Sequence, residues 1–298
     1  MNVIWVIAIF LLVIIVMKNY EHYTGSYNIF KAYKDHMKPF VFTIANQPRA
    51  FELPYKQKIP LKIIQTGWSK TLDLYNYQCC KINIHMNPEY EYLYFDDKDC
   101  IDFINTNFPE MLQWYDKLRP GAYKADLFRL LALKKLGGVY LDLKTTCFQP
   151  LRDVIKPEDE FISIKDTMKG SIYNGIMACT PDHPVIQNAI NLYVDNIKNE
   201  RYGINPLDIG GPQTIGRALN IFLGKDQLSD IEENSTDTIR MVGKWLVIGS
   251  DIAIFTSFDE KTLLFNRTCP SYSINKVKQM LKGKEYHTLW LLKKVYST

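Results

Sequence analysis

Residues 119–151 read RPGAYKADLFRLLALKKLGGVYLDLKTTCFQPL, and this stretch decides the fold. Its apolar residues from Ala122 to Leu136 lie on nearly every side of a helical wheel, which predicts a buried helix. Asp126 and Arg129 stand three residues apart in that helix, a spacing that puts both on one face. Because a buried unpaired charge costs several kcal/mol, the two side chains must face each other, a ligand or a wet cleft.

Two glycines end this helix and a short strand follows them. Gly137 and Gly138 can adopt the left-handed conformation of a helix C-terminus, and the apolar run 139–141 then predicts a strand. Asp142 comes directly after the strand, at the end where α/β sheets bind ligands. A structural alternative stays open, in which the helix holds only an internal salt bridge and Asp142 only starts a turn.

Composition excludes some functions. The 298 residues are 47% hydrophobic and 23% charged, and the net charge of +4 is too small to indicate a nucleic-acid partner. Six cysteines occur without a CxxC pair, so a zinc site is not expected. Two glycosylation sequons begin at Asn234 and Asn266, and they matter only if the chain enters a secretory lumen.

The N-terminus predicts a membrane anchor. Residues 3–17 are an unbroken apolar run that no small-residue cleavage site follows, which favours an uncleaved single-pass anchor in a thin membrane of the ER or Golgi kind. By the positive-inside rule, the lysines after this run favour a cytosolic catalytic domain instead of a lumenal one, so the orientation stays open. We expect an anchor at 1–18, a stem at 19–58 and a catalytic domain at 59–298.

Strands and helices alternate from about residue 60 to 200, which predicts an α/β fold with a mostly parallel sheet. The expected strands cover residues 59–68, 91–95, 161–164 and 172–180, and the expected helices cover residues 98–108, 184–197 and 212–223. Asp97 is a natural N-cap, and the order Asp182-His183-Pro184 is typical of a helix start, so His183 is predicted to be structural. The turn at 210–214 is rich in glycine and could present N–H groups to an anion.

Three segments of the sequence resemble a known family. They are IPLKIIQTGW at 59–68, KADLFRLLALKKLGGVYLDLKTTCFQPL at 124–151 and YHTLW at 286–290. They are similar to segments of the Asp-X-Asp sugar transferases, which include yeast-type initiating α-1,6-mannosyltransferases and capsular polysaccharide transferases, with clostridial glucosylating toxins as distant relatives. The resemblance covers residues 59–150 well and implies a type-A, Rossmann-like glycosyltransferase fold.

The same resemblance implies roles for individual residues. Gln65, Thr66 and Trp68 match the pocket for the nucleotide base and ribose. Asp126 would hold sugar hydroxyls, and Arg129 would hold sugar or phosphate.

The remaining roles concern the metal and the closing loop. Asp142 matches the first Asp of the motif, which reaches ribose and metal. His287 matches a late ligand near the diphosphate, and Trp290 a residue of the closing loop.

The motif departs from the family at its second Asp, the usual ligand of Mn²⁺ or Mg²⁺, because Lys144 stands there. An ammonium group cannot bind a cation, so the metal is doubtful. Three explanations stay open. Lys144 neutralises the leaving diphosphate together with Arg129; or a metal persists on Asp142, His287 and the substrate phosphates; or catalysis is lost. Lys144 could also point away from the site.

The function implied by the resemblance is retaining transfer of a hexose from a UDP- or GDP-linked sugar. The acceptor would be a hydroxyl of a glycan, protein or lipid. No Ser-His-Asp or paired Glu arrangement competes with this reading. The alternative is a membrane-tethered module that binds nucleotide sugar or glycan without catalysis.

Overall fold

The computed structural model describes residues 41–247, 252–268 and 286–297. The predicted anchor at 3–17 and residues 19–40 of the predicted stem lie outside these residues. Within the described residues, no helix is both long and apolar enough to cross a membrane. Phe42–Thr298 forms one compact unit.

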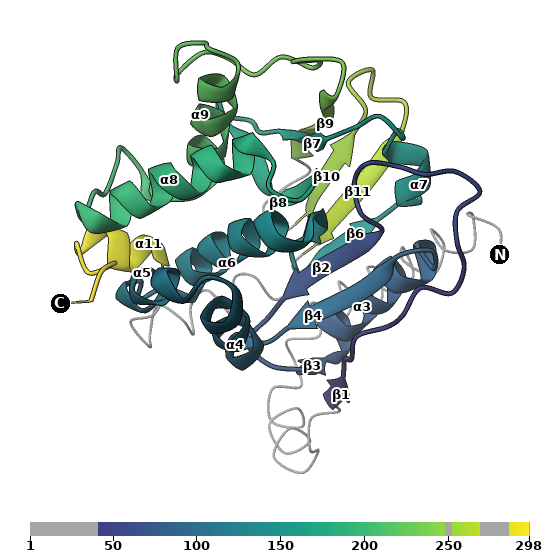
Figure 1. Cartoon of the computed structure of the whole chain (residues 1–298), viewed down its shortest axis with the longest axis horizontal. Helices are drawn as coiled ribbons and strands as arrows, with labels where there is room; N and C mark the ends of the chain where they lie inside the picture. Colours follow the sequence, from purple (N-terminus) through teal and green to yellow (C-terminus); the bar gives the residue numbers. More distant parts are fainter. Residues whose placement is uncertain (1–40, 248–251, 269–285, 298) are drawn as a thin grey trace, which may run out of the picture. The chain divides into compact units, whose positions relative to one another are not determined.

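The strands form a nine-stranded sheet with the order β4-β2-β5-β8-β7-β9-β10-β11-β6, and a separate two-stranded sheet of β1 and β3 (Figure 1). Their bounds are β1 Val41–Thr43, β2 Lys62–Thr66, β3 Thr71–Asp73, β4 Glu91–Phe95, β5 Gly138–Leu141, β6 Thr145–Cys147, β7 Phe161–Lys165, β8 Ile172–Cys179, β9 Ile239–Val247, β10 Ile252–Thr256 and β11 Leu263–Thr268.

The sheet is mixed, so the predicted mostly parallel sheet is wrong. β2 runs parallel to β4 and β5, and β7 runs parallel to β9, whereas every other neighbouring pair is antiparallel. The physical reason lies in the connections. β7 is joined to β8, and β10 to β11, by short loops without a crossover helix, and such loops can only reverse the chain. The parallel order holds for β4, β2 and β5, where helices link the strands.

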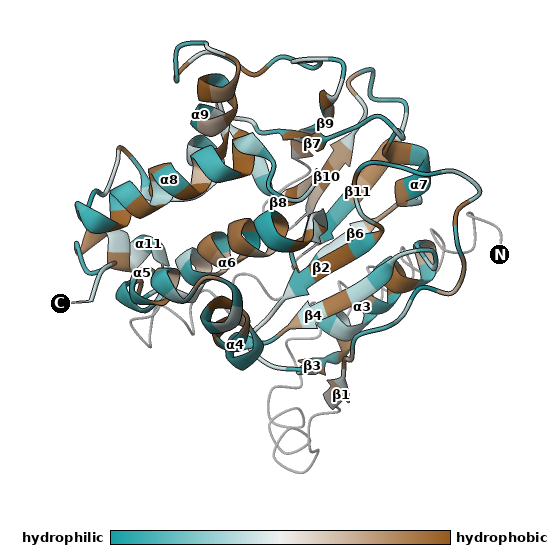
Figure 2. Ribbon diagram, in the orientation of Figure 1, coloured by the Kyte–Doolittle hydropathy of each residue, from teal (hydrophilic) through white to brown (hydrophobic). Residues whose placement is uncertain are grey.

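The helices are α3 Leu74–Met86, α4 Asp97–Asn107, α5 Leu112–Lys117, α6 Gly121–Leu136, α7 Leu151–Val154, α8 Pro184–Lys198, α9 Pro212–Phe222 and α11 Tyr286–Leu291, with 3-10 turns η2 Pro109–Met111 and η3 Pro206–Asp208. Side chains alternate between two apolar clusters on the sheet's two faces. Ile64 and Tyr140 join the cluster of α6, α8 and α9, whereas Ile63 and Leu141 join the cluster that includes Cys80 of α3. Figure 2 shows β2 hydrophobic along its middle and hydrophilic at its ends.

The predicted buried helix, glycine end and following strand are confirmed by α6 and β5. Eight residues of α6 are buried, and Gly137 and Gly138 have φ of 60° and 92°. A β-carbon at Gly138 would lie 2.7 Å from the Lys62 carbonyl of β2. The two glycines therefore allow the helix to end and the strand to enter the sheet within two residues.

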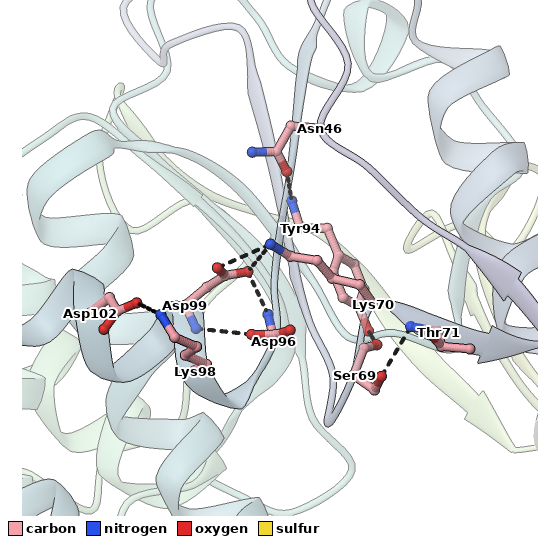
Figure 3. Close-up of polar contacts among 9 residues, drawn as sticks. All are labelled: Asn46, Ser69, Lys70, Thr71, Tyr94, Asp96, Lys98, Asp99 and Asp102. Carbon is pink, nitrogen blue, oxygen red and sulfur yellow. Dashed lines mark hydrogen bonds and ion pairs between the residues drawn. The ribbon is translucent and has the colours of Figure 1, made fainter.

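Two predicted helix starts have different outcomes. His183 caps α8, since its Nδ1 accepts the Val185 N–H at 3.3 Å, and this confirms a structural role. The predicted cap Asp97 is wrong by one residue. Asp96 caps α4 in a capping box with Asp99, because each carboxylate accepts the other's backbone N–H (Figure 3).

Candidate active site

Arg129 lies at the centre of the site, halfway along α6. Its guanidinium forms ion pairs with Asp126 (Nη2–Oδ1, 2.9 Å) and Asp142 (Nη1–Oδ1, 3.1 Å). Nη1 also donates to the Asn174 carbonyl at 2.8 Å, and the guanidinium lies 4.6 Å over the Tyr140 ring. One positive charge therefore faces two carboxylates at a place where only 7% of the Arg129 side chain is exposed.

Asp142 stands directly after β5, at the start of a tight turn into β6. The Thr145 N–H donates to the Asp142 carbonyl, and the Asp142 N–H donates to the Gly175 carbonyl, each at 2.8 Å. Oδ1 faces Arg129 and accepts the Tyr140 hydroxyl at 3.3 Å. Oδ2 faces Gly175, where a β-carbon would come within 2.6 Å of it. With 28% of its side chain exposed, Asp142 is more open to solvent than Asp126 at 13%.

Gln65 of β2 holds the backbone of this turn through a hydrogen bond to Asp142. It is fully buried, its Nε2 donates to the Asp142 carbonyl at 3.1 Å, and its Oε1 accepts the Tyr92 hydroxyl at 2.8 Å. Asn83 of α3 donates to the Thr145 carbonyl at 2.8 Å from the same side. In this structure the buried Gln65 amide positions the Asp142 backbone, and its predicted contact with the nucleotide stays a prediction.

Thr66 and Trp68 lie where β2 ends, and the loop that carries them is fastened to β4 and α4. The Gly67 N–H donates to the Phe95 carbonyl at 3.1 Å, and the Tyr94 hydroxyl donates to the Ser69 carbonyl at 3.0 Å. Lys70 forms an ion pair with Asp99 at 2.9 Å (Figure 3). The Trp68 side chain is thus presented from a held loop and is 59% exposed. An exposed aromatic ring at this edge is available for stacking on a base.

The Tyr94→Phe variant tests this fastening. It removes the hydrogen bond to the Ser69 carbonyl and leaves the ring in place, so the free energy of unfolding should fall by about 1 kcal/mol. Urea unfolding measures the loss, and Trp68 fluorescence quenching by acrylamide should rise in the same variant. Unchanged quenching would show that the other contacts hold the loop alone.

Burial sets the protonation of Asp126. It raises the pKa of this carboxyl to about 7; the Arg129 charge pulls the pKa down and the Asp142 charge pushes it up. Asn174 Nδ2 donates to Asp126 Oδ1 at 2.9 Å. Near neutral pH the carboxyl therefore lies close to its midpoint, where it can act both as donor and as acceptor toward sugar hydroxyls.

This raised pKa predicts a pH dependence of stability. From about pH 4 to 7, folded Asp126 keeps its proton and the unfolded carboxyl loses it, so the free energy of unfolding falls as pH rises and levels off above 7. His183 acts oppositely, because burial lowers its pKa from 6.5 to about 4. The test is therefore the difference between wild type and Asp126→Asn in urea unfolding across this window. Parallel pH profiles would contradict the raised pKa.

Lys144 follows Asp142 by two residues in the turn between β5 and β6. Its neighbour Leu143 packs on the apolar cluster that includes Cys80 of α3. Burial raises the pKa of the Cys79 thiol in α3 to about 12, and the Lys144 charge works against that rise. The Lys144 charge is therefore close enough to α3 to act on Cys79, while Asp126 and Arg129 belong to α6.

The described residues do not fit a metal ion held by the protein. No group of three or more His, Cys, Asp or Glu side chains that could hold one occurs among them. Asp142 already gives Oδ1 to Arg129, and Lys144 replaces the second carboxylate. His287, the other predicted metal ligand, is an exposed residue of α11 whose ring lies 6.5 Å from that of Trp290.

Helix α11 brings Trp290 to the α6 side of the fold. Tyr286 of α11 packs edge-on against Tyr123 of α6 at 6.0 Å, and Trp290 Nε1 donates to the Tyr202 carbonyl at 2.6 Å. Trp290 therefore holds a structural contact next to the helix that carries Asp126. Its predicted contact with substrate stays a prediction.

Sequence reasoning missed Asn174, Gly175 and Tyr140. Asn174 and Gly175 belong to β8, and they reach the site only because β8 pairs with β5 in antiparallel register. The Asn-Gly pair inside an otherwise apolar strand was the available signal, since neither residue favours a buried strand.

Comparison with known proteins supports the reading of this site. Residues 73–162 match the family model of the glycosyltransferase sugar-binding region containing the DXD motif, and these residues include α6, β5 and the motif turn. The predicted resemblance is confirmed. In this chain the DXD motif reads Asp142-Leu143-Lys144.

Similar proteins are named glycosyltransferases. An uncharacterized glycosyltransferase of Acanthamoeba polyphaga mimivirus is 34% identical over 113 residues, 37% of this chain and 43% of its own. Inositol phosphoceramide mannosyltransferase 3 of Schizosaccharomyces pombe is 30% identical over 107 residues, 36% of this chain and 29% of its own. The mannosyl phosphorylinositol ceramide synthase SUR1 of Saccharomyces cerevisiae is 29% identical over 137 residues, which cover 46% of this chain and 35% of its own.

The matched region spans less than half the length of each of these relatives. Among solved structures, the PaToxG glycosyltransferase aligns with 56% of this chain and 71% of its own, at a TM-score of 0.47 and 18% identity.

Proposed function

We propose that the chain is a glycosyltransferase that moves a hexose from a nucleotide-diphosphate sugar to an acceptor hydroxyl with retention at the anomeric carbon. The carrying observation is the buried group of Asp126, Arg129 and Asp142 at the end of β5, inside the segment that matches the sugar-binding region. Because the Asp126 pKa is raised to about 7, the two acidic side chains and one guanidinium carry a net charge between zero and −1 near neutral pH. Sugar hydroxyls can donate to such a site.

The relatives' names guide the choice of sugar and acceptor. They name mannosyl transfer and an inositol phosphoceramide or phosphorylinositol ceramide acceptor. We therefore propose GDP-mannose as the first donor to test, with UDP-linked sugars for comparison. The proposed acceptor class is a lipid-linked polyol, with glycans and proteins as the other classes.

The chain's own residues can supply three parts of this reaction. Trp68 offers a stacking surface for the base, and Asp126 binds hydroxyls of the transferred sugar. Lys144 neutralises charge on the departing diphosphate, as a charged donor in a preorganised site can do. The phosphate oxygen takes the acceptor proton, so no protein base is required.

A divalent cation, if bound, would add charge neutralisation at the diphosphate. We derive no step from it, because the residues around Asp142 do not form a set of ligands for a cation.

A second function is favoured by one observation. Lys144 stands where the family has a metal-binding Asp, and this change could leave a membrane-tethered module that binds nucleotide sugar without transfer. Membrane tethering itself is a proposal that rests on the apolar run 3–17. Placement in an ER or Golgi lumen, or with a cytosolic domain, rests on that run and its flanking lysines.

One experiment separates the two functions. Hydrolysis and transfer are assayed with GDP-mannose, UDP-glucose and UDP-N-acetylglucosamine, beside calorimetry with the same donors. Binding accompanied by turnover supports the transferase. Binding without turnover for every donor supports the binding module, and neither binding nor turnover contradicts both.

A further inference from the structure

Several buried polar atoms without a hydrogen-bond partner gather on the α3 side of the motif turn. They are the Thr145 Oγ1, the Tyr173 hydroxyl and the Trp245 Nε1. Thr145 is fully buried and Tyr173 is 5% exposed. A buried polar atom left unpaired costs about 1–3 kcal/mol, so three of them on one face of the sheet indicate a missing partner.

Strand pairing places these atoms on one face of the sheet. Tyr173 and Trp245 are edge to face with ring centroids 4.9 Å apart, and Tyr173 also contacts Phe255 at 4.8 Å. Phe255 pairs with Phe265, and two residues farther along β11 lies Arg267. Residues that are directly paired, or two apart, share a face, so Arg267 lies on the face of Phe255.

The same register brings Arg267 to the motif. Arg267 of β11 pairs directly with Thr145 of β6, the residue that follows Lys144. The Arg267 charge acts on Tyr173, because it lowers the pKa of that hydroxyl against the larger upward effect of burial. Thus a guanidinium, two hydroxyls and an indole N–H belong to the same face of the sheet.

This region adjoins the carboxylate oxygen of Asp142 that Arg129 does not use. A β-carbon at Gly175 would lie 2.6 Å from Asp142 Oδ2 and 2.7 Å from the Tyr173 hydroxyl, so both oxygens border the same point. Asp166 is the other carboxylate that acts on Tyr173, and its Oδ1 accepts the Thr167 N–H at 2.6 Å. The region is therefore continuous with the sugar site and is rich in donors.

We propose that Arg267, Tyr173, Trp245 and Thr145 form a phosphate subsite on the α3 side of Asp142. Hydroxyl and N–H donors beside a guanidinium match the oxygens of a phosphate group, and Arg129 cannot serve there because two carboxylates and a carbonyl already occupy it. The phosphate is either the diphosphate of the donor or a phosphate on the acceptor. Both sources rest on the proposed function, whereas the subsite itself can be tested without turnover.

Binding of inorganic pyrophosphate to the full chain tests the subsite. Arg267→Gln should weaken the calorimetric affinity at least about tenfold, and Trp245→Phe and Tyr173→Phe should weaken it several-fold while keeping ring packing. Arg201→Gln is the matched control, because Arg201 pairs with Asp195 on an exposed surface. Equal affinity of wild type, Arg267→Gln and Trp245→Phe would overturn the proposal and would leave buried water as the partner of these atoms.

Two kinetic arms identify the source of the phosphate. If the donor diphosphate binds there, Arg267→Gln raises the KM for nucleotide sugar in hydrolysis without acceptor. If an acceptor phosphate binds there, the variant instead lowers the preference for inositol 1-phosphate over inositol. A wild-type chain that binds pyrophosphate through Arg267 but turns over no donor would support the subsite and contradict the proposed function.

Discussion

Asp126→Asn should lose transfer activity by about 100-fold or more and stay folded. The amide keeps an oxygen that can accept from Asn174 and from Arg129, while Arg129 retains its pair with Asp142. Because Asp142 remains as the counter-ion of Arg129, the substitution leaves no buried charge unpaired and costs little stability. The loss of a preorganised charged group at a transferring sugar costs two to three orders of magnitude in turnover.

The measurement pairs initial rates of transfer with urea unfolding on the same preparation. Asp195→Asn serves as the control, since Asp195 pairs with Arg201 on the surface and changes the same functional group. An Asp126→Asn protein that unfolds readily but keeps its specific activity would reduce the Asp126–Arg129 pair to an internal salt bridge. That outcome is the structural alternative that the sequence left open.

If Lys144 neutralises the leaving diphosphate as proposed, Lys144→Met should lower turnover by about 100-fold in the absence of metal. The same proposal expects wild-type turnover to be insensitive to EDTA, since Lys144 stands where the family has its metal-binding Asp. Lys144→Asp places a second carboxylate beside Asp142. It should be the variant whose turnover Mn²⁺ raises.

Lys134→Met is the matched control, because Lys134 also lies within the matched region but pairs with the exposed Asp182. Loss of wild-type turnover on adding EDTA, with recovery on adding Mn²⁺, would contradict the assignment of Lys144 as the cation. It would point to a metal held by Asp142 and the substrate's own phosphates. Lys144→Asp that is inactive both with and without Mn²⁺ would leave Lys144 as an essential cation.

Local signals predicted the segment that carries the site. The all-round apolar helix, the glycine pair and the strand before Asp142 depend on neighbouring residues alone, and α6 and β5 agree with them. The mostly parallel sheet was wrong because strand direction depends on which strands pair, a non-local property. The hairpin β7–β8 was visible only as the short gap between the expected strands at 161–164 and 172–180.

The surroundings of the site were not predictable for the same reason. Asn174 contacts Asp126, which is 48 residues away in the sequence, and Arg267 of β11 pairs with Thr145 of β6. Gln65 carried a family role in base binding, yet its position within β2 turns it into the interior. The sequence shows that these residues are polar, but the strand register of the sheet decides which residues they contact.

The glycine pair at 137 and 138 has a consequence for how the site tolerates change in chain length. Helix α6 ends and strand β5 begins within these two residues, so no flexible loop lies between Arg129 and Asp142. One residue inserted between them in the helix would turn the earlier part of α6 by about 100° and carry Arg129 away from the carboxylate. The number of residues between Arg129 and Asp142 therefore sets the distance between guanidinium and carboxylate. A deletion or insertion here would separate the two groups even if every side chain of the site were kept.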